Sequence, residues 1–441
     1  MRPNGRVPHC AGRRSPRAAY PPDMPLARLL HAATELALRL DRLAPGVLDG
    51  PVPDRALARR VDDEARPDPR ALVEDAERLR REVAASGLPA ARARYLDAVL
   101  VTLACHARLL TGERPGYLEE VRSLFGVVPR RPDPDEYREV HRRLGDLLPG
   151  RGPVAARMRA YRESDVVPPE RLGPAVTAVA AELRRRVRAG PGIPDGEDAT
   201  VELVGERPWT AFTRYRGGLR SEVSITTAAR VRGGALLPLL AHELYPGHHT
   251  QYCHAETASV RHPELALRLV RGPQGLIAEG AAEAAVTVVP GPGWGAVAQR
   301  ALAGAGVRID GGLAERVEAE LDLLGRVRQD AALLRHVDGA GPDEVAGYLS
   351  RWLLVPDERA RRILAFLDHP RWRGYPVTYA EGAPLVRAWL ARHPDGPVAG
   401  LRTLLGTPVL PADLLTVGGD TPRSGSATAA HPEQSYLRPY Q

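Results

Sequence analysis

The chain has 441 residues, which is long enough to bury a large core and, as a first expectation, to form two or three subdomains. Its composition, 44% hydrophobic and 26% charged, is that of a soluble globular protein and excludes a disordered chain. The 61 basic residues are all arginine, and much of the formal excess of +7 lies in residues 2–17. Charge is the one feature that favours nucleic-acid binding, and we predict no nucleic-acid partner.

The cysteine spacing and the hydropathy of the sequence indicate the cellular compartment of the protein. Cys10, Cys105 and Cys253 have no paired spacing, which argues against a disulfide framework or a cysteine zinc site and favours a reducing compartment. No run approaches the roughly 18 apolar residues of a membrane helix, and no apolar export segment follows residues 1–23. We therefore expect a cytoplasmic protein without a membrane partner, and the sequence leaves its oligomeric state open.

The first half of the chain has helical periodicity. Residues 1–23 are rich in Arg and Pro and predict a disordered basic tail, and residues 24–190 predict an N-terminal helical subdomain. One apolar stripe at helical spacing is Leu72, Ala76, Leu79 and Val83. Residues 95–110 are apolar on nearly every side and predict a buried helix, in which Cys105 and His106 are interpreted as packing residues.

A cluster of glycines and prolines at residues 190–196 predicts the main subdomain boundary, with a catalytic subdomain at residues 191–415. Within it, residues 222–227 alternate and are rich in β-branched side chains, which predicts a short strand. This strand could pair with an extended substrate at a sheet edge, or it could equally be an ordinary core strand. Helical spacing then returns, and residues 416–441 predict a disordered tail. We expect a mainly α fold with a small β-sheet.

The chemistry concentrates in the segment His-Glu-Leu-Tyr-Pro-Gly-His-His, residues 242–249, which follows an apolar helix. In zincins, the pattern HExxH places two histidines one helical turn apart around a Zn²⁺ ion, with the glutamate as general base. That pattern indicates His242 as a metal ligand and Glu243 as the base. The position of the second histidine is altered here by Pro246 and Gly247.

Two histidines compete for the second ligand position. On a straight helix, His248 lies about 120° from His242 around the axis, whereas His249 lies nearly beneath it. Pro246 cannot donate to the carbonyl of His242, and Gly247 readily takes non-helical angles, so a kink or bulge is expected. If these two residues form a bulge, His248 returns to the ligand position, and both alternatives stay open at this point.

The segment from His242 to Gln251 resembles the signature HExxPGHH, followed by Gln, of a widespread bacterial family of unknown function, number 885 in the series of such domains, related to the gluzincin zinc metallopeptidases. The resemblance covers roughly residues 200–410. It implies His248 as the second ligand, with His249 as the alternative. It also implies a helical metallopeptidase fold, with the sheet beside the zinc helix and a cleft between two helical halves.

The same resemblance implies the rest of the site. Gluzincins take a third ligand from a glutamate on a later helix, and Glu279 in Glu-Gly matches that position, with Glu283 one turn on as a supporting residue or an alternative ligand. The family usually has aromatic residues after Glu-Gly, whereas alanines follow here. A later segment, residues 371–382, supplies the tyrosine that stabilises an oxyanion.

Tyr379 is the candidate for that oxyanion donor, and Arg373 and Tyr375 are candidates for substrate binding, since each could stabilise developing charge or hold a substrate carboxylate. Two imidazoles and one carboxylate would leave the fourth zinc position for water, with Glu243 accepting its proton. The predicted function is zinc-dependent hydrolysis of a peptide or small amide, by an exopeptidase or oligopeptidase.

Two alternatives remain. A descendant of the family could keep the fold or the metal and act only as a metal-binding or peptide-binding protein. A basic nucleic-acid-binding protein would bind with an affinity that falls steeply with salt and is indifferent to chelators.

Overall fold

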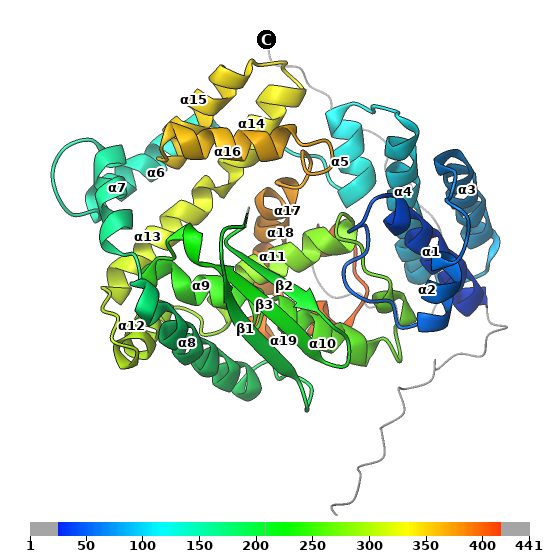
Figure 1. The fold of residues 1–441 in the computed structure, drawn as a ribbon, viewed down its shortest axis with the longest axis horizontal. Helices are drawn as coiled ribbons and strands as arrows, with labels where there is room; N and C mark the ends of the chain where they lie inside the picture. Colours follow the sequence, from blue (N-terminus) through cyan, green and yellow to red (C-terminus); the bar gives the residue numbers. More distant parts are fainter. Residues whose placement is uncertain (1–24, 208, 416–441) are drawn as a thin grey trace, which may run out of the picture.

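The computed structural model describes residues 25–207 and 209–415, and it is mainly helical, with one three-stranded sheet (Figure 1). The predicted fold class is confirmed. The predicted tails at residues 1–23 and 416–441 lie outside the described residues. None of the described helices combines the length and the apolar character that a bilayer crossing requires.

The first four helices lie on the right of Figure 1. They are α1 (Pro25–Leu43), α2 (Arg55–Asp62), α3 (Pro69–Ala85) and α4 (Ala90–Thr111). α1, α3 and α4 share one core, and α2 packs against α1. The predicted apolar stripe is the buried face of α3. The predicted buried helix is α4, and it buries both Cys105 and His106, as expected. His106 also makes a polar contact, in which its Nδ1 atom lies 2.9 Å from a guanidinium nitrogen of Arg271.

A second core joins helices from both halves of the chain. From the first half come α5 (Tyr117–Phe125), α6 (Pro134–Leu147) and α7 (Val154–Ser164). From the second half come α11 (Pro273–Val288), α13 (Gly311–Leu323), α14 (Val327–His336), α15 (Pro342–Leu353), α16 (Asp357–Asp368), α17 (Val377–Ala380), α18 (Gly382–Arg392), α19 (Gly396–Gly406) and α20 (Pro411–Leu415).

The third core lies around the sheet. It is formed by α8 (Pro169–Ala189), α9 (Gly233–Glu243), α12 (Trp294–Gly304) and the inner face of the sheet. The break at residues 190–196 falls between α8 and β1, and α8 packs in the same core as α9. The subdomain division there stays a prediction. The remaining elements are α10 (His248–Ala258), η1 (Thr227–Ala229), η2 (Pro263–Ala266) and η3 (Leu324–Arg326).

The sheet has the strand order β1-β3-β2. β1 (Asp198–Val204) runs parallel to β3 (Arg220–Thr226), and β2 (Ala211–Tyr215) runs antiparallel to it. The strand predicted at residues 222–227 is therefore confirmed as β3. Its predicted pairing with substrate is wrong, because both edges of β3 already carry backbone hydrogen bonds to neighbouring strands. Among the strands that the structure describes, β2 is the edge next to α9 and α10.

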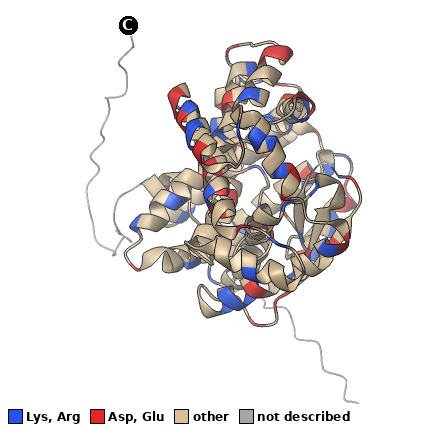
Figure 2. Cartoon of the chain, turned by 90° about the vertical axis from the view of Figure 1, so that its left-hand side faces the viewer, with Lys and Arg blue, Asp and Glu red and all other residues tan. Residues whose placement is uncertain are grey.

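Charged residues are distributed over the helices. Figure 2 shows arginines and acidic residues interspersed on the side of the molecule that it presents. Many of them form ion pairs one helical turn apart, such as Arg142 with Glu139 and Asp146. Such pairs are ordinary features of solvated helix surfaces.

Candidate metal centre

The helix that carries His242 and Glu243 ends directly after them. α9 is apolar along most of its length and buried, which fixes its position against α8 and the sheet. It ends at Glu243, and α10 begins at His248, so the expected kink is a complete break between two helices. Pro246 has no N–H with which to continue the helical pattern, so the helix cannot run through this segment.

Gly247 makes the tight break possible. Its N–H donates to the carbonyl of Ala241 at 2.8 Å. A Cβ atom at this position would lie 1.8 Å from the carbonyl oxygen of His242, closer than any non-bonded contact allows. Its φ is −72°, so the requirement is for space and not for a left-handed backbone. The chain therefore turns back against the end of α9 and brings the first residue of α10 beside His242.

Three predicted ligands meet at one point. The Nε2 atoms of His242 and His248 lie 3.1 Å apart, and each lies 3.5 Å from a carboxylate oxygen of Glu279. One ligand atom from each residue lies within 4.8 Å of the others, and the three side chains form a group that could hold a metal ion. His248, and not His249, is the histidine that joins His242.

The second nitrogen of each imidazole is held by another side chain. Nδ1 of His242 lies 3.3 Å from Oε1 of Glu283, and Nδ1 of His248 lies 3.1 Å from Oε1 of Gln251. Both acceptors can only accept a hydrogen from the ring, so each Nδ1 carries one. In the neutral ring, which is the form that binds a metal, Nε2 then presents its lone pair. The amide of Gln251 is held in turn, since its nitrogen donates to the carbonyl of Ala278 at 2.8 Å.

The residues present fit a divalent cation. A tetrahedral ion with bonds of about 2.0–2.1 Å separates its ligand atoms by about 3.3 Å, close to the separations found here. Two facing lone pairs repel unless a cation lies between them. Oε2 of Glu279 is buried and has no hydrogen-bond partner within the described residues, as expected of an oxygen directed at an ion. Two imidazoles and one carboxylate are a donor set that suits zinc.

The electrostatics of His242 also favour a cation. Desolvation acts to lower the pKa of His242, but the hydrogen bond to Glu283 and the charges of Glu283, Glu279 and Glu243 prevail and raise it to about 10. The acidic surroundings therefore favour positive charge on this imidazole. A bound divalent cation would supply that charge in place of the proton.

Glu243 is held by a residue that sequence reasoning missed. The hydroxyl of Thr213, on β2, lies 2.5 Å from Oε2 of Glu243 and 3.0 Å from its carbonyl oxygen. Glu243 is buried, and its charge acts on both His242 and Tyr379. The predicted base thus lies beside the candidate ligands and is fixed from the side of the sheet.

Tyr375 and Tyr379, from residues 371–382, both lie at the metal centre but make different contacts there. The hydroxyl of Tyr375 donates to Oε1 of Glu279 at 2.8 Å, so this residue supports a candidate ligand. The ring of Tyr379 packs edge-on against that of Tyr375, at 5.8 Å between centroids. Its hydroxyl has no hydrogen bond within the described part of the chain. Desolvation and the charges of Glu279, Glu283 and Glu243 raise the pKa of Tyr379 well above its usual value, so it stays protonated.

Two glycines bring that segment to the site. A Cβ at Gly280, directly after Glu279, would lie 2.4 Å from the carbonyl oxygen of Gly382. A Cβ at Gly382 would lie 2.6 Å from the carbonyl oxygen of Leu276. The two Glu-Gly segments of the sequence therefore mark a close crossing of α11 and α18.

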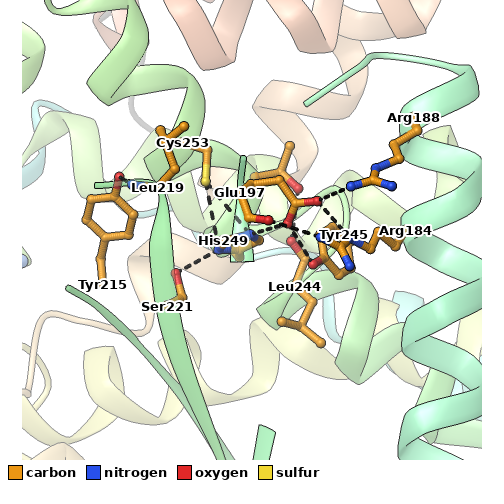
Figure 3. Close-up of polar contacts among 11 residues, drawn as sticks. Arg184, Arg188, Glu197, Tyr215, Leu219, Ser221, Leu244, Tyr245, His249 and Cys253 are labelled. Carbon is orange, nitrogen blue, oxygen red and sulfur yellow. Dashed lines mark hydrogen bonds and ion pairs between the residues drawn. The ribbon is translucent and has the colours of Figure 1, made fainter. Parts of the chain in front are cut away.

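His249 is directed away from the metal centre, which makes it wrong as the alternative ligand. It is fully buried, and its ring nitrogens lie 2.8 Å from the hydroxyl of Ser221 and 3.1 Å from Oε2 of Glu197 (Figure 3). Glu197 also accepts hydrogen bonds from Arg184 and Tyr245. This network ties α10 to α8 and to the sheet.

Arg373 makes its contacts elsewhere. Its guanidinium forms an ion pair with the buried Glu120 of α5 and donates to the carbonyl of Pro115. No contact joins it to the histidines or to Glu279 within the described residues. The prediction that Arg373 binds substrate has no support in these contacts, because its charge is already neutralised. Sequence reasoning missed Arg328, whose charge acts on both Tyr379 and Glu283, and Arg387, whose charge also acts on Glu283.

No protein-family model matches the chain, and no curated protein matches it. Among solved structures, it is similar to one from Colwellia psychrerythraea described as a "putative lipoprotein". The two chains are 15% identical, with a TM-score of 0.49, and the match covers 88% of this chain and 74% of the other.

Proposed function

We propose that this protein is a zinc-dependent peptidase or amidase, related to the gluzincins, with His242, His248 and Glu279 as the zinc ligands. The observation that carries the proposal is the convergence of two Nε2 atoms, 3.1 Å apart, on the carboxylate of Glu279. Its unpartnered Oε2 lies 3.5 Å from Nε2 of His242, and its Oε1 lies 3.5 Å from Nε2 of His248. Three protein ligands leave one coordination position open, as in catalytic rather than structural zinc sites.

When bound, zinc supplies Lewis-acid polarisation of a substrate carbonyl and makes a water molecule more acidic. Glu243 accepts the proton of the attacking water on its carboxylate. Thr213 holds the Oε2 atom of Glu243, which leaves Oε1 as the proton acceptor. Glu243 then returns the proton to the leaving amine.

The two tyrosines divide the remaining work. Tyr375 holds Glu279 in place through its hydroxyl. Tyr379 donates its free hydroxyl to the oxyanion that forms at the substrate carbonyl, and its raised pKa keeps that hydroxyl protonated. The substrate backbone pairs with the edge strand β2, which lies beside Glu243 through Thr213.

The proposal is tested on the whole chain with a peptide library read by mass spectrometry. The wild-type protein should contain about one zinc ion per chain, lose cleavage when stripped by a chelator and regain it with zinc. Glu243→Gln should retain zinc and lose cleavage by about 10²- to 10⁴-fold. Glu344→Gln, at an exposed position on α15, is the matched control and should leave both unchanged.

Two results would count against the proposal. A zinc-loaded wild-type protein that cleaves no peptide in the library would point to a metal-binding protein without activity. Cleavage that survives in Glu243→Gln, or in the stripped protein, would remove the assigned base or the assigned metal from the reaction.

A further inference from the structure

Two arginines on neighbouring helices have no acidic partner, and one of them lies beside the metal centre. Arg328, in the first turn of α14, forms no ion pair or hydrogen bond within the described residues, and the same is true of Arg359 on α16. A third arginine, Arg162 on α7, donates only to the backbone carbonyls of Leu353 and Leu354. Among the described residues, more than half of the buried or half-buried arginines have an acidic partner, as Arg232 has Glu318 at 2.5 Å.

These arginines are close enough to repel one another. Desolvation and the charges of Arg232, Arg359 and Arg328 lower the pKa of Arg162 to about 10. Desolvation, followed by the charge of Arg328, also lowers the pKa of Arg359. Like charges that are partly stripped of water and left without counter-ions are unfavourable unless an anion completes the site.

Solvent reaches both unpaired arginines. Arg359 is exposed, and Arg328 is half-buried. A guanidinium that solvent reaches and that no acidic side chain neutralises is open to an anionic ligand.

Arg328 connects this group to the metal centre. α14 packs against α17, which carries Tyr379, and also against α16, which carries Arg359. The electrostatic partners of Arg328 are Tyr379 and Glu283, of which Glu283 carries a negative charge. Glu283 is already engaged by His242, so it does not serve as a dedicated counter-ion for Arg328.

We propose that Arg328, supported by Arg359 and Arg162, binds a carboxylate of the peptide substrate beside the metal centre. The guanidinium group matches a carboxylate through two parallel hydrogen bonds, which lysine cannot provide. The carboxylate comes either from the C-terminus of a peptide or from an acidic side chain. This inference rests on the proposed function for its substrate class, and it takes over the role that the sequence suggested for Arg373.

Binding is measured on the catalytically inactive Glu243→Gln protein, so that it does not depend on cleavage. The probes are a dye-labelled alanine tetrapeptide with a free C-terminal carboxylate, its C-terminal amide, and the amide with glutamate as the last residue. Fluorescence polarisation should show the free acid binding about 10- to 100-fold more tightly than the amide. If the glutamate-containing amide binds as tightly as the free acid, the site also takes an acidic side chain.

Variants then show which residues cause the difference in affinity between the free acid and the amide. Adding Arg328→Gln should remove the preference for the acid, Arg328→Lys should restore only part of it, and Arg359→Gln should weaken it. The controls are Arg335→Gln on α14 and Arg361→Gln on α16, whose guanidiniums pair with Asp368 and Asp343. Both should leave the preference unchanged. In wild-type protein that cleaves the probe, Arg328→Gln should act mainly on KM.

The outcomes separate this inference from the proposed function. Equal binding of acid and amide, or a preference that survives Arg328→Gln, overturns the carboxylate site even if both probes are hydrolysed. A preference that is lost in Arg328→Gln supports the site even if no probe is ever cleaved.

Discussion

The carboxylate of Glu283 lies 3.3 Å from Nδ1 of His242, on the edge of the ring opposite the one that faces His248 and Glu279. Desolvation acts to raise the pKa of Glu283, but its hydrogen bond with His242 and the charge of that imidazole prevail and lower it. Glu283 therefore stays ionised, fixes the tautomer of His242 and increases the basicity of its Nε2 atom.

Replacing Glu283 by Gln should weaken zinc binding by about 10- to 100-fold, because the neutral amide keeps the size of the side chain but loses its charge. The affinity is measured by competition with a chromogenic chelator, and Glu344→Gln serves as the control. An affinity equal to that of the wild-type protein would mean that Glu283 does not support the ligand.

A second prediction concerns the break between α9 and α10. In Gly247→Ala, the added methyl group would overlap the carbonyl oxygens of His242 and Ala241, both backbone atoms at the end of a buried helix. The two helix ends must separate, so we expect a loss of zinc binding and a loss of stability of several kcal/mol.

The matched control is Gly347→Ala, in the middle of α15, where a Cβ would meet nothing within 4 Å. This variant should be neutral or more stable by roughly 0.5–1 kcal/mol, because alanine favours helix more than glycine does. Urea unfolding monitored by circular dichroism compares the two. A Gly247→Ala protein with wild-type stability and zinc content would show that the break does not depend on glycine.

The sequence predicted the elements whose signal is local. The stripe on α3, the apolar character of α4 and the alternation in β3 each reflect a single segment, and each is confirmed. The sequence could not show whether β3 is an edge strand or the central strand of the sheet, because that depends on which strands lie on either side of it. Nor could periodicity show that α8 packs with the sheet.

In the candidate site, too, residues within a local motif could be predicted from the sequence, and residues from distant elements could not. The group of His242, His248 and Glu279 follows from motif residues, and the structure brings them together. Gln251, three residues after His248, could have been identified as its partner from helical spacing. Thr213 and Arg328 come from elements distant in sequence and belong to no motif, so only the packing of β2 against α9 and of α14 against α17 reveals them.

A third prediction separates the adjacent histidines. His248→Ala should lose zinc, because its imidazole is a candidate metal ligand. It should leave the free energy of unfolding of the metal-free protein nearly unchanged, because His248 belongs to none of the hydrophobic cores of the described residues. His249→Ala should behave in the opposite way, since it removes one buried hydrogen-bond partner from Glu197 and one from Ser221 and costs about 1–3 kcal/mol. Zinc content of the folded protein and urea unfolding of the metal-free protein are measured together. Loss of zinc from folded His249→Ala with zinc retained in His248→Ala would reverse the assignment.

The last prediction follows from the buried carboxylate of Glu197, whose side chain is fully inaccessible to solvent. Desolvation acts to raise its pKa, but hydrogen bonds from His249, Arg184 and Tyr245 and the charge of Arg184 prevail and lower it from 4.5 to about 2. A carboxylate whose pKa is lower in the folded than in the unfolded chain stabilises the fold above the unfolded pKa. That stabilisation disappears as the pH falls from about 4.5 towards 2.

The shift in Glu197 corresponds to a stabilisation on the order of 3 kcal/mol at neutral pH. Glu197→Gln should therefore be less stable than the wild-type protein at pH 7. The difference should narrow as the pH falls below about 4.5, because this carboxylate takes up a proton in the unfolded wild-type chain while it stays ionised in the folded protein until about pH 2. Urea unfolding of both metal-free proteins between pH 7 and pH 3 measures the difference, and Glu344→Gln should show none of this pH dependence. A difference that stays constant over that range would mean that Glu197 contributes by packing, because a charge that stabilised the fold would be lost on protonation.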